Sequence, residues 1–279
     1  MARTRFAPSP TGWLHLGHAA SALYASRRGE MVLRIEDIDR SRCRAEFETG
    51  IYEDLAWLGI TFPTPVVRQS ERWAEYECAL SRLSEEGLLF PCFCTRADIK
   101  REVEGAGVAP HGPDGPVYPG TCRSLSSQER SERMAAGEAY ALRLDMAESV
   151  RRFASLLWHD DVRGEQRAVP ELFGDVVLAR KDTPASYHLC VTVDDAAQEI
   201  GLVTRGEDLF EATHVHRLLQ AVLGLPTPGY SHHRLLTGED GKKLSKRDGA
   251  ATLRAMRESG VSAAEVRAMV EVEGRRSKE

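Results

Sequence analysis

Two short segments, far apart in the chain, carry residue types that could bind and activate a nucleoside triphosphate. Near the start, His15 and His18 follow the Pro/Gly-rich turn 8–12. A strand over 4–7, this turn and a helix that begins near Leu16 would direct backbone N–H groups and two imidazoles toward one helix N-terminus, which is a favourable place for an anion. The pattern therefore predicts a site for triphosphate oxygens.

The second segment lies near the other end, where Lys-Leu-Ser-Lys-Arg at 243–247 follows the Gly-rich turn 238–241. Lys243 and Lys246 are cations that could neutralise the charge that builds on a leaving pyrophosphate. Either segment alone is more often an ordinary surface feature. Together they indicate that an acid is activated as an adenylate, with ATP as co-substrate and Mg²⁺ accompanying it.

The elements around the first segment follow an α/β rhythm. A helix over 16–27 and a strand over 31–35 are predicted after the first strand, and Glu36 follows directly. Ligands bind beyond the carboxyl ends of parallel strands, so the turn and Glu36 should share one crevice. Amphipathic helices are predicted over 46–58 and 72–86. We therefore expect an α/β fold with a Rossmann-like, doubly wound parallel sheet.

Composition is compatible with this fold. The chain has 279 residues, of which 42% are hydrophobic, and a formal net charge of −5. It can bury a sizeable core. A nucleic-acid contact would come from a local patch, such as Arg123, 151–152, 180–181 or 275–276, and not from the global field. No apolar run resembles a signal peptide or reaches the roughly 20 residues of a membrane span, so a cytoplasmic protein is expected.

A loop-rich stretch over 90–142 interrupts the α/β pattern. Its cysteines, Cys92, Cys94 and Cys122, could place three thiolates on one tetrahedral Zn²⁺, which requires a fourth ligand. His111 and Tyr118 are the nearby candidates, and on chemistry alone imidazole is the better ligand. The other three of the six cysteines are expected to be reduced thiols. These are Cys43, Cys78 and Cys190.

After this stretch the chain returns to the α/β pattern. A strand over 175–182, a turn at 183–184 and a helix that begins near Tyr187 are predicted. Two short helices, near 253–258 and 263–270, should follow the lysine-containing segment.

The two chemical segments resemble the HIGH and KMSKS elements of class I aminoacyl-tRNA synthetases, and the stretch 5–12 resembles their glutamate-specific branch. The resemblance extends over nearly the whole chain. It implies a ligase that uses ATP to convert glutamate to glutamyl-adenylate. Leu244 stands where Met is frequent in the second element, a volume-conserving change that puts little in doubt.

The resemblance also implies roles for individual residues. Arg205 could form two parallel hydrogen bonds with a substrate carboxylate, and Glu36 could accept from the substrate ammonium. Which carboxylate of glutamate meets Arg5 and which meets Arg205 stays open. The implied glutamate-binding residues are Arg5, Phe6, Ala7, Pro8, Ser9, Glu36, Tyr187 and Arg205; the ATP-binding residues are His15, Gly17, His18 and Lys246; and the catalytic residues are His15, His18, Lys243 and Lys246.

Within this class the chain resembles the short, glutamyl-synthetase-like proteins known as glutamyl-Q tRNA(Asp) synthetases. In that family a Cys-x-Cys…Tyr-x-x-x-Cys arrangement holds zinc, and Cys92, Cys94, Tyr118 and Cys122 match it. The resemblance thus favours Tyr118 over His111 and implies one structural Zn²⁺ per chain. It further implies that glutamate is activated without tRNA and is then attached to the queuosine base at the wobble position of tRNA(Asp).

Four parts are expected along the chain. Residues 1–89 and 143–236 would form the two halves of the catalytic nucleotide-binding domain, 90–142 the zinc-containing insertion, and 237–279 the KMSKS-like loop with a short helical tail. We expect no anticodon-binding domain, and a monomer. Three alternatives remain open: a catalytic domain that charges a tRNA 3′ end, an adenylate-forming ligase for another small acid, and a non-catalytic RNA-binding paralogue.

Overall fold

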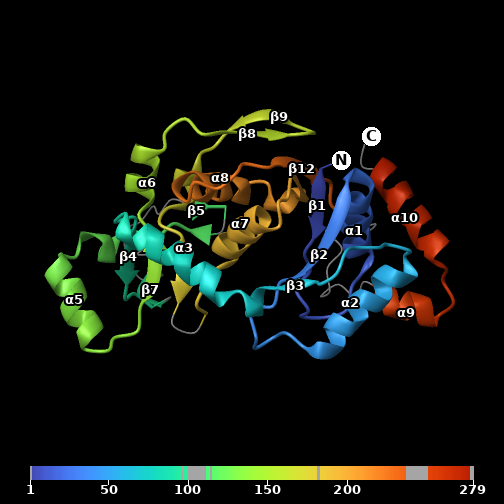
Figure 1. Cartoon of the computed structure of the whole chain (residues 1–279), viewed down its shortest axis with the longest axis horizontal. Coiled ribbons are helices and arrows are strands. Elements are labelled where there is room, and N and C mark those ends of the chain that lie inside the picture. Colours follow the sequence, from blue (N-terminus) through green and yellow to red (C-terminus); the bar gives the residue numbers. More distant parts are fainter. Residues whose placement is uncertain are drawn as a thin grey trace.

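A computed structural model describes residues 2–95, 97–99, 111–113, 115–180, 183–236 and 251–276. Figure 1 shows an elongated molecule, with a small antiparallel sheet and α5 at one end and α9 and α10 at the other. Parallel strands covered by helices lie between these ends. The α/β class predicted from the sequence is therefore confirmed.

The first half of the parallel core is a three-stranded sheet covered by α1. β1 pairs with β2 and β2 pairs with β3, all in parallel. α1 buries a face of small residues that includes Ala19, Ala22 and Ala25, which lets the helix lie close to β1. The bounds are β1 (Arg3–Phe6), α1 (Leu16–Arg28), β2 (Glu30–Ile35), α2 (Ala45–Trp57) and β3 (Val67–Arg68).

The second half of the core contributes further parallel strands. β11 is parallel to β12, β12 is parallel to β8, and β9 is antiparallel to β8 at the edge. β1 and β11 lie side by side, and the N–H of Gly201 donates to the carbonyl of Arg3 (3.0 Å) beside them. The bounds are β8 (Leu157–Asp160), β9 (Gly164–Arg167), α7 (Tyr187–Ala197), β11 (Leu202–Gly206), the 3₁₀ helix η4 (Glu207–Leu209), α8 (Ala212–Val222) and β12 (Gly229–His233).

A second sheet is antiparallel and contains strands from the loop-rich stretch. β7 lies between β4 and β10 and is antiparallel to both. The strand expected near 175–182 is β10, which joins this sheet and not the parallel core. The bounds are β4 (Leu89–Cys92), β5 (His111–Gly112), β6 (Gly115–Pro116), η2 (Thr121–Ser124), α5 (Ser127–Ala135), β7 (Ala141–Leu144), α6 (Met146–Arg152), η3 (Pro170–Phe173) and β10 (Val177–Arg180).

A long helix connects the two sheets. α3 (Trp73–Glu85), preceded by η1 (Gln69–Glu71), packs on α7 and reaches β4. The buried hydroxyl of Tyr76 on α3 donates to Asp194 of α7 (2.9 Å). Leu83 of the same helix is fully buried in a cluster with apolar residues of α7 and α8. These contacts fix the antiparallel sheet against the parallel core.

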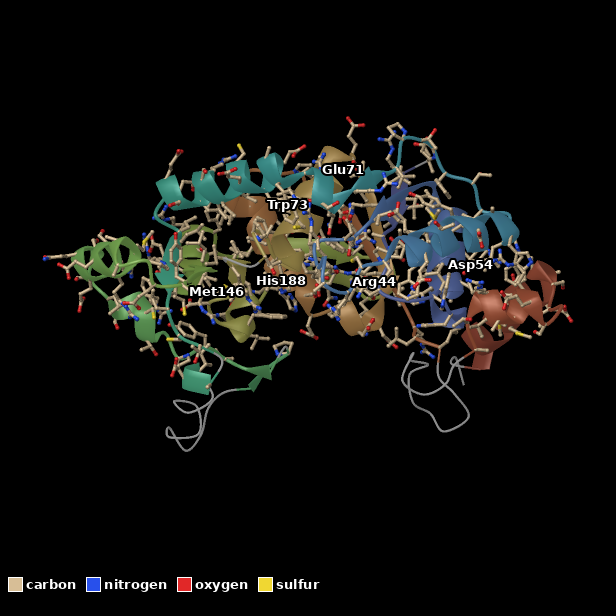
Figure 2. The ribbon with its side chains drawn as sticks, turned by 90° about the horizontal axis from the view of Figure 1, so that it is seen from below. Arg44, Asp54, Glu71, Trp73, Met146 and His188 are labelled. Carbon is tan, nitrogen blue, oxygen red and sulfur yellow. The ribbon has the colours of Figure 1, made fainter. Side chains whose placement is uncertain are left out.

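The last two helices, α9 (Leu253–Glu258) and α10 (Ala263–Arg276), pack on the first half of the core. Leu253 and Val266 are fully buried in one apolar cluster with residues of α1 and α2. Figure 2 shows Asp54 of α2 beside these helices, where Arg257 lies 3.7 Å from its carboxylate. Among the described residues, no helix has the length and apolar character needed to cross a membrane.

Candidate active site

A cavity of about 540 Å³ lies at the carboxyl ends of β1, β2 and β11, against the beginnings of α1 and α7. This is where ligands bind in parallel α/β sheets. The structure brings together there the residues that the sequence implies for glutamate and the first segment implied for ATP. They are Arg5, Phe6, Ala7, Pro8, Ser9, His15, Gly17, His18, Glu36, Tyr187 and Arg205.

The second chemical segment, with Lys243 and Lys246, lies outside the described residues. One described flank lines the cavity, and the other pairs with a residue that lines it. Leu236, before the segment, contributes to the cavity wall. After the segment, Thr252 forms a β-bridge with His15, and the neighbouring N–H of residue 253 donates to the carbonyl of residue 14 (2.8 Å).

The two histidines of the first segment cap α1. Nδ1 of His15 accepts from the N–H of Gly17 (3.1 Å), and Nδ1 of His18 accepts from the N–H of His15 (3.1 Å). Gly17 permits this arrangement, since a Cβ there would lie 3.0 Å from the His15 ring. A neutral imidazole that accepts at Nδ1 carries its proton on Nε2. Both rings are therefore hydrogen-bond donors at Nε2, which suits phosphate oxygens.

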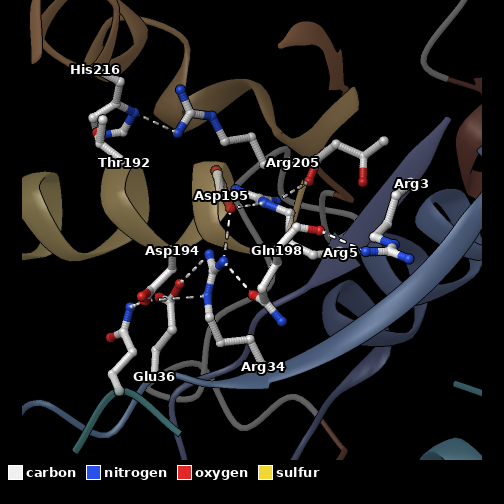
Figure 3. Close-up of polar contacts among 12 residues, drawn as sticks. Arg3, Arg5, Arg34, Glu36, Thr192, Asp194, Asp195, Gln198, Arg205 and His216 are labelled. Atoms are coloured by element: carbon white, nitrogen blue, oxygen red, sulfur yellow. Dashed lines mark hydrogen bonds and ion pairs between the residues drawn. The ribbon is translucent and has the colours of Figure 1, made fainter. Parts of the chain in front are cut away.

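One buried ion pair and one hydrogen bond to the backbone hold Arg5 near the end of β1. Its Nε lies 3.1 Å from Oδ1 of Asp195, and its Nη1 donates to the carbonyl of Thr204 (2.7 Å). The fully buried Arg34 places Nη1 2.8 Å from the same Asp195 oxygen, so the carboxylate lies between two guanidinium groups (Figure 3). Burial opposes charge on Asp195, but Arg5 and Arg34 outweigh it and hold the pKa of this carboxyl below its usual range.

Glu36 follows β2 and is part of the same network. Its Oε1 lies 3.3 Å from Nη2 of Arg34, and its side chain is 10% exposed. Burial raises the pKa of Glu36, and the charges of Arg34 and Arg5 oppose this only in part. A cation in the cavity would stabilise the ionised form of Glu36. The geometry is therefore compatible with binding of a substrate ammonium.

Arg205, near the end of β11, is buried among uncharged partners. Its Nε donates to Nε2 of His232 (3.1 Å), and its Nη2 donates to Oγ1 of Thr213 (2.6 Å). Its Nη1 lies 3.1 Å from Nδ1 of His216 (Figure 3). In the part of the chain that the structure describes, no carboxylate lies within ion-pair distance of Arg205. A buried guanidinium in such surroundings is suited to an anionic ligand.

Tyr187 is the first residue of α7 and also faces the cavity. The side chain of Ser186 accepts a hydrogen bond from the N–H of Leu189 and so caps the N-terminus of α7. This cap fixes Tyr187 as the first residue of the helix. Burial raises the pKa of the Tyr187 hydroxyl. The hydroxyl therefore stays protonated at neutral pH and can donate a hydrogen bond to a ligand.

Several residues of this network match no motif. Asp195, His216 and His232 lie on three different elements, and only the fold brings them to the arginines. Arg34 does carry a signal in the sequence, because it is the one charged residue in the otherwise apolar stretch 31–35. A buried charge needs a partner of opposite charge, so an arginine at this position indicates a buried ion pair.

Three cysteine thiols converge between β4 and η2. The Sγ atoms of Cys92, Cys94 and Cys122 all lie within 4.8 Å of one another, and those of Cys94 and Cys122 are 3.5 Å apart. Thiolates on one tetrahedral zinc at Zn–S distances of about 2.3 Å would be roughly 3.8 Å apart. The cluster therefore fits a metal ion of zinc size.

The phenol of Tyr118 lies beside this cluster. Its Oη is 3.8 Å from Sγ of Cys94 and accepts from the N–H of Cys122 (2.8 Å). Burial opposes ionisation of Cys122, but the N–H of Phe93 and the Tyr118 hydroxyl lower the pKa of its thiol. The side chain of His111, the alternative fourth ligand, lies outside the described residues. Tyr118 thus places an oxygen beside the thiols, where a fourth ligand would be needed.

The fold and the cavity define a class of protein. Residues 1–276 match the family described as tRNA synthetases class I (E and Q), catalytic domain. A crystal structure of a glutamate tRNA ligase from Elizabethkingia meningosepticum in complex with its amino acid has a TM-score of 0.72 and 30% sequence identity, and the match covers 89% of this chain and 52% of that chain. The chain is a class I aminoacyl-tRNA synthetase-like ligase, as the sequence predicts.

The share of each relative that the chain spans narrows the class. The glutamyl-Q tRNA(Asp) synthetase of Rhodobacter capsulatus is 48% identical over 96% of this chain and 99% of its own. A glutamate–tRNA ligase of Hydrogenobaculum sp. is 38% identical over 93% of this chain, which spans only 55% of that relative. The chain belongs to the family of glutamyl-Q tRNA(Asp) synthetases.

Proposed function

We propose that this protein converts glutamate and ATP to glutamyl-adenylate without tRNA and then transfers glutamate to the queuosine base at the wobble position of tRNA(Asp). The observation that carries the proposal is the single cavity in which Arg5, Arg205 and Glu36 adjoin His15 and His18. Groups for two carboxylates, one ammonium and a polyphosphate therefore meet at one sheet edge.

In this proposal the amino acid is bound by charge complementarity. Arg5 and Arg205 take the two carboxylates of glutamate, and Glu36 accepts from its ammonium. Tyr187 adds a hydroxyl donor, and Ser9 on the turn after β1 adds another. Phe6, Ala7 and Pro8 also line the cavity. The arrangement favours glutamate over glutamine, which has only one carboxylate.

Activation requires alignment and charge neutralisation and no protein nucleophile. A carboxylate oxygen of glutamate attacks the α-phosphorus of ATP, a carbon–oxygen–phosphorus linkage forms, and the bond to the departing pyrophosphate breaks. His15 and His18 donate to phosphate oxygens at the start of α1, where Gly17 lets the backbone approach the nucleotide. Lys243 and Lys246 neutralise the pyrophosphate, which the position of both flanks of their segment supports. Mg²⁺ would accompany the phosphates of ATP.

The second step completes the reaction at the same carbonyl. A nucleophile on the modified base attacks the adenylate, the carbon–oxygen bond to phosphate breaks, and AMP leaves. Single-stranded loops with splayed bases are what proteins can read in RNA, so an anticodon loop is a plausible acceptor. We propose that the reaction takes place in the cytoplasm, where ATP and tRNA are found.

We further propose that Cys92, Cys94, Tyr118 and Cys122 hold one structural Zn²⁺. The support is the convergence of three thiols and a phenol between β4 and η2. A closed site of this kind would further fix two segments that already pack together through Phe90, Cys92, Tyr118 and Cys122.

The first experiment is glutamate-dependent exchange of labelled pyrophosphate into ATP in the absence of tRNA, with aspartate and glutamine as controls. Exchange with glutamate alone is expected. Exchange only after addition of tRNA(Glu) would instead favour an ordinary charging enzyme, which the similarity to glutamate–tRNA ligases makes the second candidate. Absence of exchange under every condition would favour a non-catalytic RNA-binding protein.

The transfer step needs a separate measurement. tRNA(Asp) that contains queuosine is incubated with labelled glutamate and ATP, and the label is mapped to nuclease fragments. We expect the label in the anticodon fragment. Label at the 3′ end would contradict the proposed acceptor while leaving glutamate activation intact.

A further inference from the structure

The buried guanidinium groups of the site differ in the charge around them. Arg5 and Arg34 share the carboxylate of Asp195 at 3.1 and 2.8 Å. Arg205 is equally buried, at 5% exposure, but its described hydrogen-bond partners are two imidazoles and a hydroxyl. Because a buried charge normally requires a counter-charge, this difference calls for a physical reason.

One imidazole is held by a carboxylate that does not reach Arg205. Oδ2 of Asp160 lies 2.7 Å from Nδ1 of His232, and both side chains are fully buried. The other oxygen of Asp160 accepts from the N–H groups of Val162 and Arg163, each at 2.9 Å. This geometry places the His232 proton on Nδ1 and leaves Nε2 as an acceptor for Arg205.

The other imidazole is held by a second histidine. Nε2 of His216 lies 3.1 Å from Nδ1 of His188, and its Nδ1 faces Arg205. Burial, and then the charge of Arg205, lower the pKa of His216 well below its usual value and that of His232 to about 4. Both rings are therefore neutral at physiological pH and accept from Arg205 without cancelling its charge.

We propose that His216 and His232, the latter oriented by Asp160, are positioning residues that hold Arg205 in the cavity through neutral acceptors and so keep its positive charge available to a carboxylate of the substrate. The inference rests on the proposed function, in which Arg205 binds glutamate. A carboxylate at either histidine position would hold Arg205 equally well but would compete with the substrate. Neutral acceptors hold the Arg205 side chain in place without competing with the substrate carboxylate for its charge.

The matched pair His216→Asn and His216→Asp tests this directly. Both side chains can place an oxygen near the position of Nδ1, both lose the contact with His188, and they differ only in charge. We expect His216→Asn to keep a glutamate KM near that of the wild type in pyrophosphate exchange. His216→Asp should raise it by about tenfold to a hundredfold relative to His216→Asn, the range expected when one charge-assisted interaction is lost. The KM for ATP should not change in either variant.

A binding measurement separates this effect from a general loss of activity. At one fixed glutamate concentration, glutamate should raise the melting temperature of the wild type and of His216→Asn more than that of His216→Asp. At His232, Gln can offer an oxygen near the position of Nε2, so His232→Gln should retain glutamate binding that His232→Leu loses.

Equal glutamate KM values for His216→Asn and His216→Asp would overturn the inference, since a purely structural role does not depend on this charge. So would equal binding by His232→Gln and His232→Leu. A wild-type protein with exchange activity would in that case still support the proposed function. A wild type that neither exchanges pyrophosphate with glutamate nor binds it would overturn both proposals.

Discussion

The charged residues of the cavity differ in whether they have a partner of opposite charge. Asp195 forms ion pairs with both Arg5 and Arg34, and Arg34 also forms an ion pair with Glu36. Arg205, in contrast, forms hydrogen bonds with neutral groups. The buried network therefore leaves an excess of positive charge at one place and a carboxylate with a raised pKa at another. A ligand with two carboxylates and one ammonium complements both.

Arg34 can be tested as the counter-charge of this network. Arg34→Met should lower the free energy of unfolding by about 3–5 kcal/mol, because it leaves the buried carboxylates of Asp195 and Glu36 with too little positive charge. Urea denaturation followed by circular dichroism measures the change. Arg42→Met is the control, since Arg42 is 72% exposed and pairs with Asp39 at the surface, where little change is expected. Equal losses in the two variants would contradict the proposed role of Arg34.

Asp54 should make stability depend on pH. Burial raises its pKa to about 6, and the charge of Arg257 opposes this only in part. The folded state then holds a proton that the unfolded state releases near its usual pKa of about 3.9, so stability is highest below that pH. It should fall by up to about 1.4 kcal/mol per pH unit as the pH rises to 6, and then level off.

Asp54→Asn removes this titration and supplies the control. The difference in unfolding free energy between wild type and Asp54→Asn, measured from pH 4 to pH 8, should decrease up to about pH 6 and stay constant above it. A difference that is the same at all pH values would show that Asp54 titrates normally.

At the scale of elements, local patterns predicted several helices and strands closely, but they missed α5, α6 and α8 and did not predict which strands pair. α1, α2, α3 and α9 lie within one residue of the predicted ranges, because caps and apolar periodicity are properties of neighbouring residues. β10 was predicted as a strand, but its pairing with β7 depends on the whole fold. The same holds for Arg34 and Asp195, which are 161 positions apart. Motifs identified the residues expected to face the substrate but not those that hold them.

The zinc site is a prediction about the elements β4 and η2. Cys94→Ser should reduce the zinc content of freshly purified protein, because it removes one of three converging thiolates. Glutamate-dependent exchange should remain measurable, since the cavity is formed by β1, β2, β11, α1 and α7. Metal analysis of the purified variants measures the first effect. Cys78→Ser, at an exposed position on α3, is the matched control; equal zinc in both variants would exclude the site.

At the scale of the whole molecule, the end of the described chain stabilises its beginning. α9 and α10 bury Leu253 and Val266 against α1 and α2, and the first turns of α1 line the cavity. The bridge between Thr252 and His15 joins this packing to the start of α1. Changes in the C-terminal helices should therefore affect the segment proposed to bind ATP more than the residues proposed to bind glutamate.

Leu253→Ala tests this coupling. It should cost about 2–5 kcal/mol of unfolding free energy, as for other buried leucines. The buried Leu253 side chain holds in place the backbone that bonds Leu14 and, at Thr252, pairs with His15, so the variant should also raise the KM for ATP several-fold while changing the KM for glutamate less. Leu83→Ala is the control, since Leu83 is as deeply buried but lies on α3 in a different apolar cluster. If both variants lose stability and shift the KM for ATP alike, packing of α9 has no particular connection to the nucleotide site.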